Sequence, residues 1–134
     1  MLDGGGGYDF VGNDLATTYP PGMEVEAFRV AALADAAARC DDPAIREHGT
    51  LFIRRNPDLY RLLNLEAPPQ WRRPELEIEV DVLEDVAVIE AVLNHFGPDA
   101  APGLTEIIGF LDARPDLAAS NQAAPRRWKA YRQD

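Results

Sequence analysis

A chain of 134 residues, of which 46% are hydrophobic and 27% charged, has the size and composition of one globular domain. Its net charge of −10 would repel a phosphate backbone, so we expect no nucleic-acid partner. No apolar run approaches the roughly 18 residues that cross a bilayer, and no basic and apolar leader opens the chain, so we expect no membrane partner and no secretion signal. The only cysteine, Cys40, cannot form an internal disulfide and fits a cytoplasmic location.

Short strands and helices are expected to follow one another closely in the first half of the chain. Alternating apolar residues favour strands, an alanine-rich stretch favours a helix, and Pro43 preceded by Asp42 is typical of a helix start. The expected elements are strands at 8–11 and 23–28, helices at 30–40 and about 44–54, and a segment at 59–65 that periodicity alone allows as helix or strand.

The clearest pattern in the chain lies at 76–96. Apolar and acidic residues alternate over 76–82, which predicts a strand with one apolar and one acidic face. Over 82–96 apolar residues recur every three or four positions, which predicts an amphipathic helix. The expected buried stripe is Val82, Val86, Ile89, Leu93 and Phe96. Asp81 thus falls between strand and helix, where open α/β sheets place ligands and metals, although with Glu84 it also fits a helix capping box.

The last part of the chain combines a helical pattern with a basic end. Apolar spacing predicts a helix at 104–111 and a short turn to about 119. We treat 120–134 as a basic C-terminal tail, and expect it either to dock against the acidic face or a partner subunit or to be a disordered end. Its basic and aromatic residues are Arg126, Arg127, Trp128, Lys129, Tyr131 and Arg132.

Several motifs resemble one family. The stretch Val80-Asp81-Val82-Leu83-Glu84-Asp85-Val86 resembles the V-D-T-P-E-D-L signature of cytidylyltransferases that make CMP-activated sugar acids, in particular the spore coat polysaccharide biosynthesis type within the acylneuraminate cytidylyltransferase family. Further segments are similar to the family in the same order: G-Y-D-F-V-G-N at 7–13, Y-P-P-G-M-E-V-E-A-F at 19–28, R-E-H-G-T at 46–50, R-N-P at 55–57 and L-D-A-R-P-D-L at 111–117. The likeness covers nearly the whole chain but only the second half of the family's domain.

The resemblance implies an α/β fold. Residues 1–119 would form the C-terminal half of a nucleotide-diphospho-sugar transferase-like domain of the GT-A type, a mixed sheet of about four strands flanked by about four helices, with a strand at 59–65. The family's glycine-rich, basic nucleotide loop, A-R-x-G-S-x-R-L-P-x-K, has no match, because Asp3-Gly4-Gly5-Gly6-Gly7 lacks the Lys and Ser or Thr of a phosphate loop. We therefore expect a chain that is inactive alone and is completed by a nucleotide-binding N-terminal half or by a partner chain.

By the same resemblance, the completed protein would transfer CMP from CTP to a sugar acid or a related sugar with the help of Mg²⁺. Asp81 would be the metal ligand, and the substrate would be bound by Glu24, Glu26, Arg46 and His48. Spacing alone also allows these four residues ordinary structural roles: a solvated strand face for the two glutamates, an ion pair with a neighbouring acid for the arginine, and a partly buried position for the histidine.

Two other hypotheses remain open. Four positions, Pro21, Glu24, Val82 and Leu83, differ from the family's residues, so the chain also fits a degenerate, non-catalytic relative that acts as a binding or assembly module. It also fits an unrelated small acidic α/β interaction protein. For either enzyme or module we expect a homo-oligomer or a partner chain.

Overall fold

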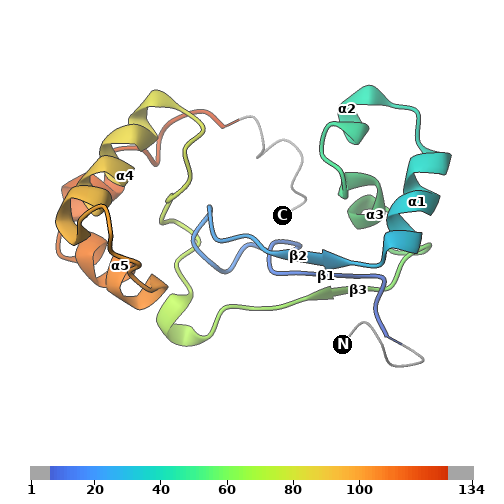
Figure 1. The fold of residues 1–134 in the computed structure, drawn as a ribbon, viewed down its shortest axis with the longest axis horizontal. Coiled ribbons are helices and arrows are strands. Elements are labelled where there is room, and N and C mark those ends of the chain that lie inside the picture. The colour runs from blue at the N-terminus through green and yellow to red at the C-terminus, as the bar shows by residue number, and fades with distance from the viewer. Residues whose placement is uncertain (1–6, 127–134) are drawn as a thin grey trace. The chain divides into compact units, whose positions relative to one another are not determined.

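The computed structural model of the chain describes residues 7–126, which form two compact units (Figure 1). The first unit comprises residues 7–16 and 25–65, and the second comprises residues 17–24 and 66–126. Each unit has its own cluster of buried apolar side chains.

A mixed sheet of three short strands lies in the first unit. Its strands are β1 (Phe10–Gly12), β2 (Glu26–Phe28) and β3 (Leu62–Asn64), in the order β2-β1-β3. β1 pairs antiparallel with β2 and parallel with β3. All three strands were predicted, including the one at 59–65, but they are shorter than expected. Between β1 and β2 the Asn13 side chain accepts a hydrogen bond from the backbone N–H of Val25 (2.7 Å), so a side chain replaces a ladder bond there.

Three helices complete the first unit: α1 (Val30–Arg39), α2 (Pro43–Arg46) and α3 (Leu51–Arg55). α1 and α3 pack over the sheet through a cluster of buried side chains: Phe10, Ala32, Ala36, Ile53 and Tyr60 (Figure 1). The single helix expected at 44–54 is wrong, because the chain turns between α2 and α3, where Gly49 has a φ of 33° that disfavours other residues. Asp42 caps α2 as expected, accepting from the N–H of Ala44 at 2.9 Å.

The second unit is helical. It contains the 3₁₀ helix η1 (Pro69–Trp71) and the α-helices α4 (Leu83–Phe96), α5 (Leu104–Asp112) and α6 (Pro115–Ala119). Its core is formed by Leu76, Ile78, Val88, Val92, Ile108, Phe110 and Leu111. The described residues thus form three strands and six α-helices, against about four of each expected.

The strand expected at 76–82 is wrong. These residues form an irregular segment with bends at Glu79, Asp81 and Val82, and within the described chain they belong to no sheet. The backbone N–H of Ile78 instead donates to the carbonyl of Pro21 at 2.9 Å. The alternating apolar residues Leu76 and Ile78 are buried, but they pack against helices and do not belong to a sheet. Glu77, which the alternation predicts to be on an exposed face, is buried as well.

The helix expected at 82–96 is confirmed as α4, but its buried stripe is not the one expected. Asp85, Val88 and Val92 are buried, whereas Val86 and Leu93 are 39% and 57% exposed. Apolar periodicity placed the stripe on the wrong side because it treated Asp85 as a surface residue, and Asp85 is buried with a charged partner described below.

A tight turn at 20–23 packs directly on the 76–82 segment. Pro20 and Pro21 are fully buried, and Gly22 has a φ of 104°. A Cβ atom on Gly22 would lie 2.7 Å from the backbone carbon and oxygen of Ile78, a contact that rigid backbone cannot relieve. Both the backbone conformation and the close approach therefore require glycine.

We predict that Gly22→Ala lowers the free energy of unfolding by about 2 to 3 kcal/mol, because it adds both backbone strain and a clash. Gly109→Ala is the matched control, since Gly109 lies inside α5 and a Cβ there meets nothing within 4 Å. The control should be neutral or stabilising by up to about 1 kcal/mol. Urea unfolding of both variants tests this, and equal midpoints would contradict it.

Candidate functional site

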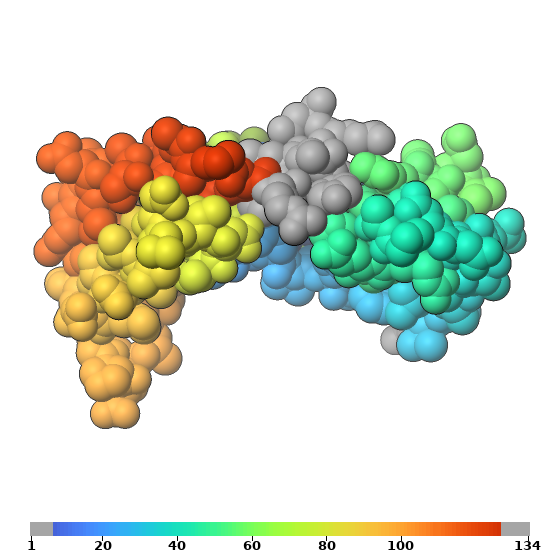
Figure 2. Space-filling view, turned by 90° about the horizontal axis from the view of Figure 1, so that it is seen from above, coloured from blue at the N-terminus to red at the C-terminus, as the bar shows by residue number. Residues whose placement is uncertain are grey.

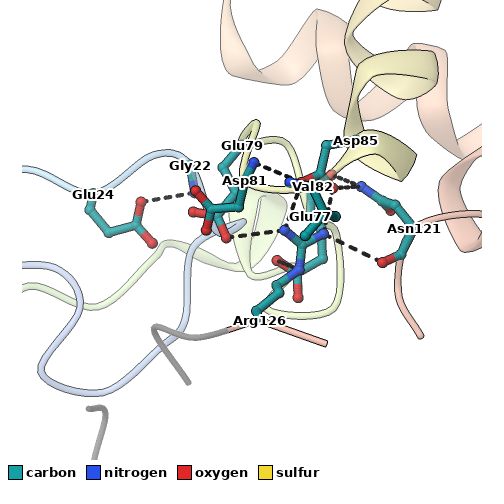
Figure 3. Close-up of polar contacts among 9 residues, drawn as sticks. All are labelled: Gly22, Glu24, Glu77, Glu79, Asp81, Val82, Asp85, Asn121 and Arg126. Carbon is teal, nitrogen blue, oxygen red and sulfur yellow. Dashed lines mark hydrogen bonds and ion pairs between the residues drawn. The ribbon is translucent and has the colours of Figure 1, made fainter. Parts of the chain in front are cut away.

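The structure divides the five residues expected at a site between the two units. Glu24 and Asp81 belong to the second unit, and Glu26, Arg46 and His48 belong to the first. The second unit also holds a group of acids around one arginine, which we call the Asp85 cluster: Glu77, Glu79, Asp85, Asn121 and Arg126 (Figure 3).

Asp81 lies at the edge of this cluster, in the turn that leads into α4. Its side chain is exposed, and Val82 follows as the N-cap residue of the helix. The capping box expected from Asp81 and Glu84 is wrong, because Asp85 does the capping: its Oδ2 accepts from the backbone N–H groups of Asp81 (2.9 Å) and Val82 (3.0 Å). The carboxylate of Asp81 is thus not needed for the cap, and within residues 7–126 it has no hydrogen-bonding partner.

Asp85 is fully buried and is the hub of the cluster. Besides the two backbone N–H groups, it accepts from both terminal nitrogens of Arg126, with Nη1 2.9 Å from Oδ2, and from the side-chain amide of Asn121 at 2.7 Å. The same amide nitrogen of Asn121 donates to the carbonyl of Glu77 at 3.1 Å. Every one of these donors stabilises the ionised form of the carboxylate.

Arg126 is also buried, and three carboxylates surround its guanidinium (Figure 3). In addition to Asp85, its Nε lies 3.4 Å from Oε2 of Glu77 and its Nη1 lies 3.5 Å from Oε1 of Glu79. We expected the basic tail to dock on an acidic face or a partner subunit, or to be a disordered end. Arg126 does lie against acids of the 76–82 segment, while Arg127 and the residues after it lie outside the described residues.

Two opposing effects act on the pKa of Asp85. Burial alone raises the pKa of its carboxyl group, because the charged form loses hydration. The hydrogen bonds from Arg126, from the backbone of Asp81 and Val82, and from Asn121 outweigh burial and lower that pKa well below the ordinary range of an aspartate. The Arg126 guanidinium correspondingly has a raised pKa, first through its hydrogen bond to Asp85.

Glu24 forms a local contact in the second unit. Its Oε2 accepts from the backbone N–H of Gly22 at 2.8 Å, which closes the turn at 20–23 (Figure 3). The residue is half-buried. Glu24 therefore has a structural role in this turn.

Two of the three expected substrate residues of the first unit, Glu26 and Arg46, have structural roles. Glu26 on β2 accepts from the hydroxyl of Thr50 (2.7 Å) and from Arg54 (3.3 Å), which joins the sheet to α3. Arg46 donates through Nη1 to the carbonyls of Ala37 and Cys40, both at 2.9 Å, and so satisfies the C-terminal end of α1. These partners are carbonyl oxygens, not the neighbouring acid with which an ion pair was expected. His48 is exposed, in the turn between α2 and α3.

Sequence reasoning missed Asp85, Asn121 and Arg126 as site residues. Asp85 is part of the matched motif, but apolar periodicity leaves it outside the expected buried stripe. Asn121 had no signal, because its two partners, the Glu77 carbonyl and Asp85, are 44 and 36 residues away.

Magnesium is the metal that the motif implies. Within residues 7–126 no three or more His, Cys, Asp or Glu side chains are grouped so as to hold a metal by themselves. Mg²⁺, however, keeps several waters and is commonly bound through one or two carboxylates together with substrate phosphates. An exposed carboxylate such as that of Asp81 fits an ion held in this second way.

The low pKa of Asp85 generates a prediction about stability. Because its pKa is lower in the folded than in the unfolded protein, the ionised carboxylate stabilises the fold above the unfolded value of about 4, and this contribution is lost as the pH falls further. We predict that Asp85→Asn costs about 3 kcal/mol at pH 7, since it leaves Arg126 without its main partner, and that it weakens the loss of stability between about pH 5 and pH 2.

Urea unfolding across that pH range measures both quantities. Asp99→Asn is the control, because Asp99 is an exposed acid outside the cluster. An Asp85→Asn variant with the pH dependence of the unmodified chain would contradict the prediction.

Within the described residues no helix is both long enough and apolar enough to cross a membrane. No protein-family model matches the chain. The chain is 37% identical over 78 residues to the spore coat polysaccharide biosynthesis protein SpsF of Bacillus subtilis (strain 168), an alignment that covers 58% of the chain and 32% of that protein. It is 30% identical over 112 residues to the uncharacterized protein MJ1063 of Methanocaldococcus jannaschii, covering 84% of the chain and 45% of that protein.

The fold is similar to that of a cytidylyltransferase from Leptospira borgpetersenii serovar Hardjo-bovis (strain JB197), with a TM-score of 0.77 and 21% sequence identity. That match covers 94% of the chain and 51% of the solved structure, so the chain spans about half or less of each protein it matches. The expected fold class, a mixed sheet with flanking helices, is confirmed. The chain is thus a relative of the spore coat polysaccharide biosynthesis protein, and it has the α/β fold of part of a cytidylyltransferase.

Proposed function

We propose that the chain supplies the metal and sugar side of a nucleotidyltransferase that transfers CMP from CTP to a sugar acid or a related sugar. The observation that carries this proposal is the position of Asp81. Its carboxylate is exposed and outside the helix cap, while its backbone N–H is held by Asp85 (2.9 Å). The likeness to SpsF and to the cytidylyltransferase fold supports the choice of reaction class.

In this reaction a sugar hydroxyl attacks the α-phosphorus of CTP, the bond from that phosphorus to the bridging oxygen breaks, and pyrophosphate leaves. Such a step asks the protein mainly to position the reactants and to neutralise charge. A Mg²⁺ ion, when bound, would neutralise charge on the phosphate oxygens. Asp81 would hold this ion, and the anchored backbone would keep the carboxylate in place.

The sugar would be held by other side chains of this chain. We propose the substrate contacts for Glu24, Glu26, Arg46 and His48 that the motifs imply. Glu24 would bind the sugar from the turn that its bond to Gly22 closes, and Glu26 would have to share its oxygens with Thr50 and Arg54. The nucleotide would be held by a separate segment or chain, so the described residues alone would be inactive. A cytoplasmic location would suit a reaction that uses CTP.

A second candidate function is that of a non-catalytic module that assembles with other protein chains. An exposed apolar surface on α4 favours this function. α4, in the yellow part of Figure 2, exposes Leu83, Val86 and Leu93 by 84%, 39% and 57%. These positions follow one another at helical spacing, and exposed apolar patches often mark protein contacts. Self-association of the chain that is lost in Leu83→Glu and Leu93→Glu, without any nucleotide effect, would favour this function.

We predict that Asp81→Asn strongly weakens metal binding at this position, with little effect on the stability of the fold. In the unmodified chain, Mn²⁺ in place of Mg²⁺ should broaden the NMR signals of Asp81 and Val82 in the presence of CTP, and Asp81→Asn should weaken this effect at least about tenfold. In a protein completed by its nucleotide-binding part, the rate of pyrophosphate release from CTP and a sugar acid should fall by about 100-fold or more in Asp81→Asn.

Glu84→Gln is the matched control, because Glu84 is an exposed acid in the first turn of the same helix. It should retain the metal effect. Equal Mn²⁺ broadening in Asp81→Asn and Glu84→Gln would rule out Asp81 as the ligand.

A further inference from the structure

The turn that carries Asp81 is positioned by side chains rather than by a sheet. Residues 76–82 have no strand partner within the described chain, so no ladder of backbone hydrogen bonds fixes them. Three contacts take its place: the N–H of Ile78 donates to Pro21, the carbonyl of Glu77 accepts from Asn121, and the N–H groups of Asp81 and Val82 donate to Asp85. Of these, only the contact with Asp85 reaches Asp81 itself.

The orientation of the Asp85 carboxylate therefore matters for Asp81. The terminal torsion of an aspartate side chain is soft, so one hydrogen bond would not hold the plane of its carboxylate. Arg126 binds both oxygens at once, with Nη1 on Oδ2 and Nη2 on Oδ1. A guanidinium has this fixed fork, whereas an ammonium group is a point charge with no such geometry.

The surroundings of Arg126 hold the fork in place. Its side chain is completely buried, and Glu77 and Glu79 flank it on the segment that leads to Asp81. The red segment ending at Arg126 lies beside the yellow start of α4 in Figures 1 and 2. The arginine thus contacts both the segment before Asp81 and the helix after it.

We infer that Arg126 is a positioning residue for Asp81: through the plane of the Asp85 carboxylate it sets the backbone at 81–82 and so the direction of the Asp81 side chain. The functional part of this inference rests on the proposed function, because the proposed function gives Asp81 a metal ion to bind. The structural part does not depend on any ligand.

Arg126→Lys tests the inference, since it keeps the charge and removes the fork. Amide hydrogen exchange followed by NMR on the whole chain should show Asp81 and Val82 exchanging at least about tenfold faster, while Val88 and Val92 in the middle of α4 keep their protection. A general loss of stability would affect all four amides. Arg73→Lys is the control, because Arg73 pairs with Glu75 and Asp112 in the same unit, outside the Asp85 cluster.

Adding Mn²⁺ and CTP to the same samples separates the positioning role of Arg126 from the metal-binding role of Asp81. In Arg126→Lys, the Mn²⁺ concentration needed to broaden the Asp81 signal should rise at least about tenfold, as expected when the side chain that binds the metal points in the wrong direction. Unchanged exchange at Asp81 and Val82 in Arg126→Lys would overturn the inference. Faster exchange in the variant, with no Mn²⁺ effect in the unmodified chain, would support the positioning role and contradict the proposed metal role.

A second variant covers the case in which Arg126→Lys does not fold. Asn121→Ala removes one donor from Oδ1 of Asp85, together with the donor to the Glu77 carbonyl, and leaves every charge in place. It should speed exchange at Asp81 and Val82 in the same selective way, though less than loss of the fork. Uniform acceleration across α4, or none, would count against the inference.

Discussion

The buried ion pair between Asp85 and Arg126 is the interaction on which the second unit depends. Burial removes water from both charges, and each is the main partner of the other among the polar groups that compensate for this loss. The two residues are 41 positions apart, so the pair ties the start of α4 to the end of the described chain. It also decides which side of α4 faces the core, because an aspartate takes a place in the buried stripe that an apolar residue would otherwise occupy.

The first unit has a different ionic contact at its centre. Arg54 on α3 pairs with Asp14 (2.9 Å) and with Glu26 (3.3 Å), and its side chain is only 19% exposed. This contact joins the strand β2 to the helix that packs over the sheet. Glu26 is therefore part of the framework of the unit, whatever further contact it makes, because removing it would leave a half-buried arginine with one carboxylate fewer.

Neighbouring acids have separate tasks around Asp81. Asp85 is buried, accepts hydrogen bonds from several donors and stays ionised, which makes it suited to holding backbone in place. Asp81 is exposed and outside the cap, which makes it suited to meeting a cation. A carboxylate that must bind a ligand is best held by contacts other than its own oxygens, and the sequence D-x-x-x-D at the start of a helix achieves this in a single turn.

The sequence by itself determined many local elements and the family likeness. The first two strands, α1, α4 and α5, the cap at Asp42 and the cytidylyltransferase motif around Asp81 follow from periodicity and from residues close together in the chain, whereas the strand at 59–65 was expected only from the resemblance. Only the tertiary structure decided the rest. Leu76 and Ile78 pack in a core with helices and their segment joins no sheet within the described chain, because alternation of apolar residues indicates burial and does not identify a pairing partner. Asp85 lies in the core because Arg126 and Asn121 reach it across more than 30 residues, and a local pattern of apolar and charged residues carries no information about partners at that distance.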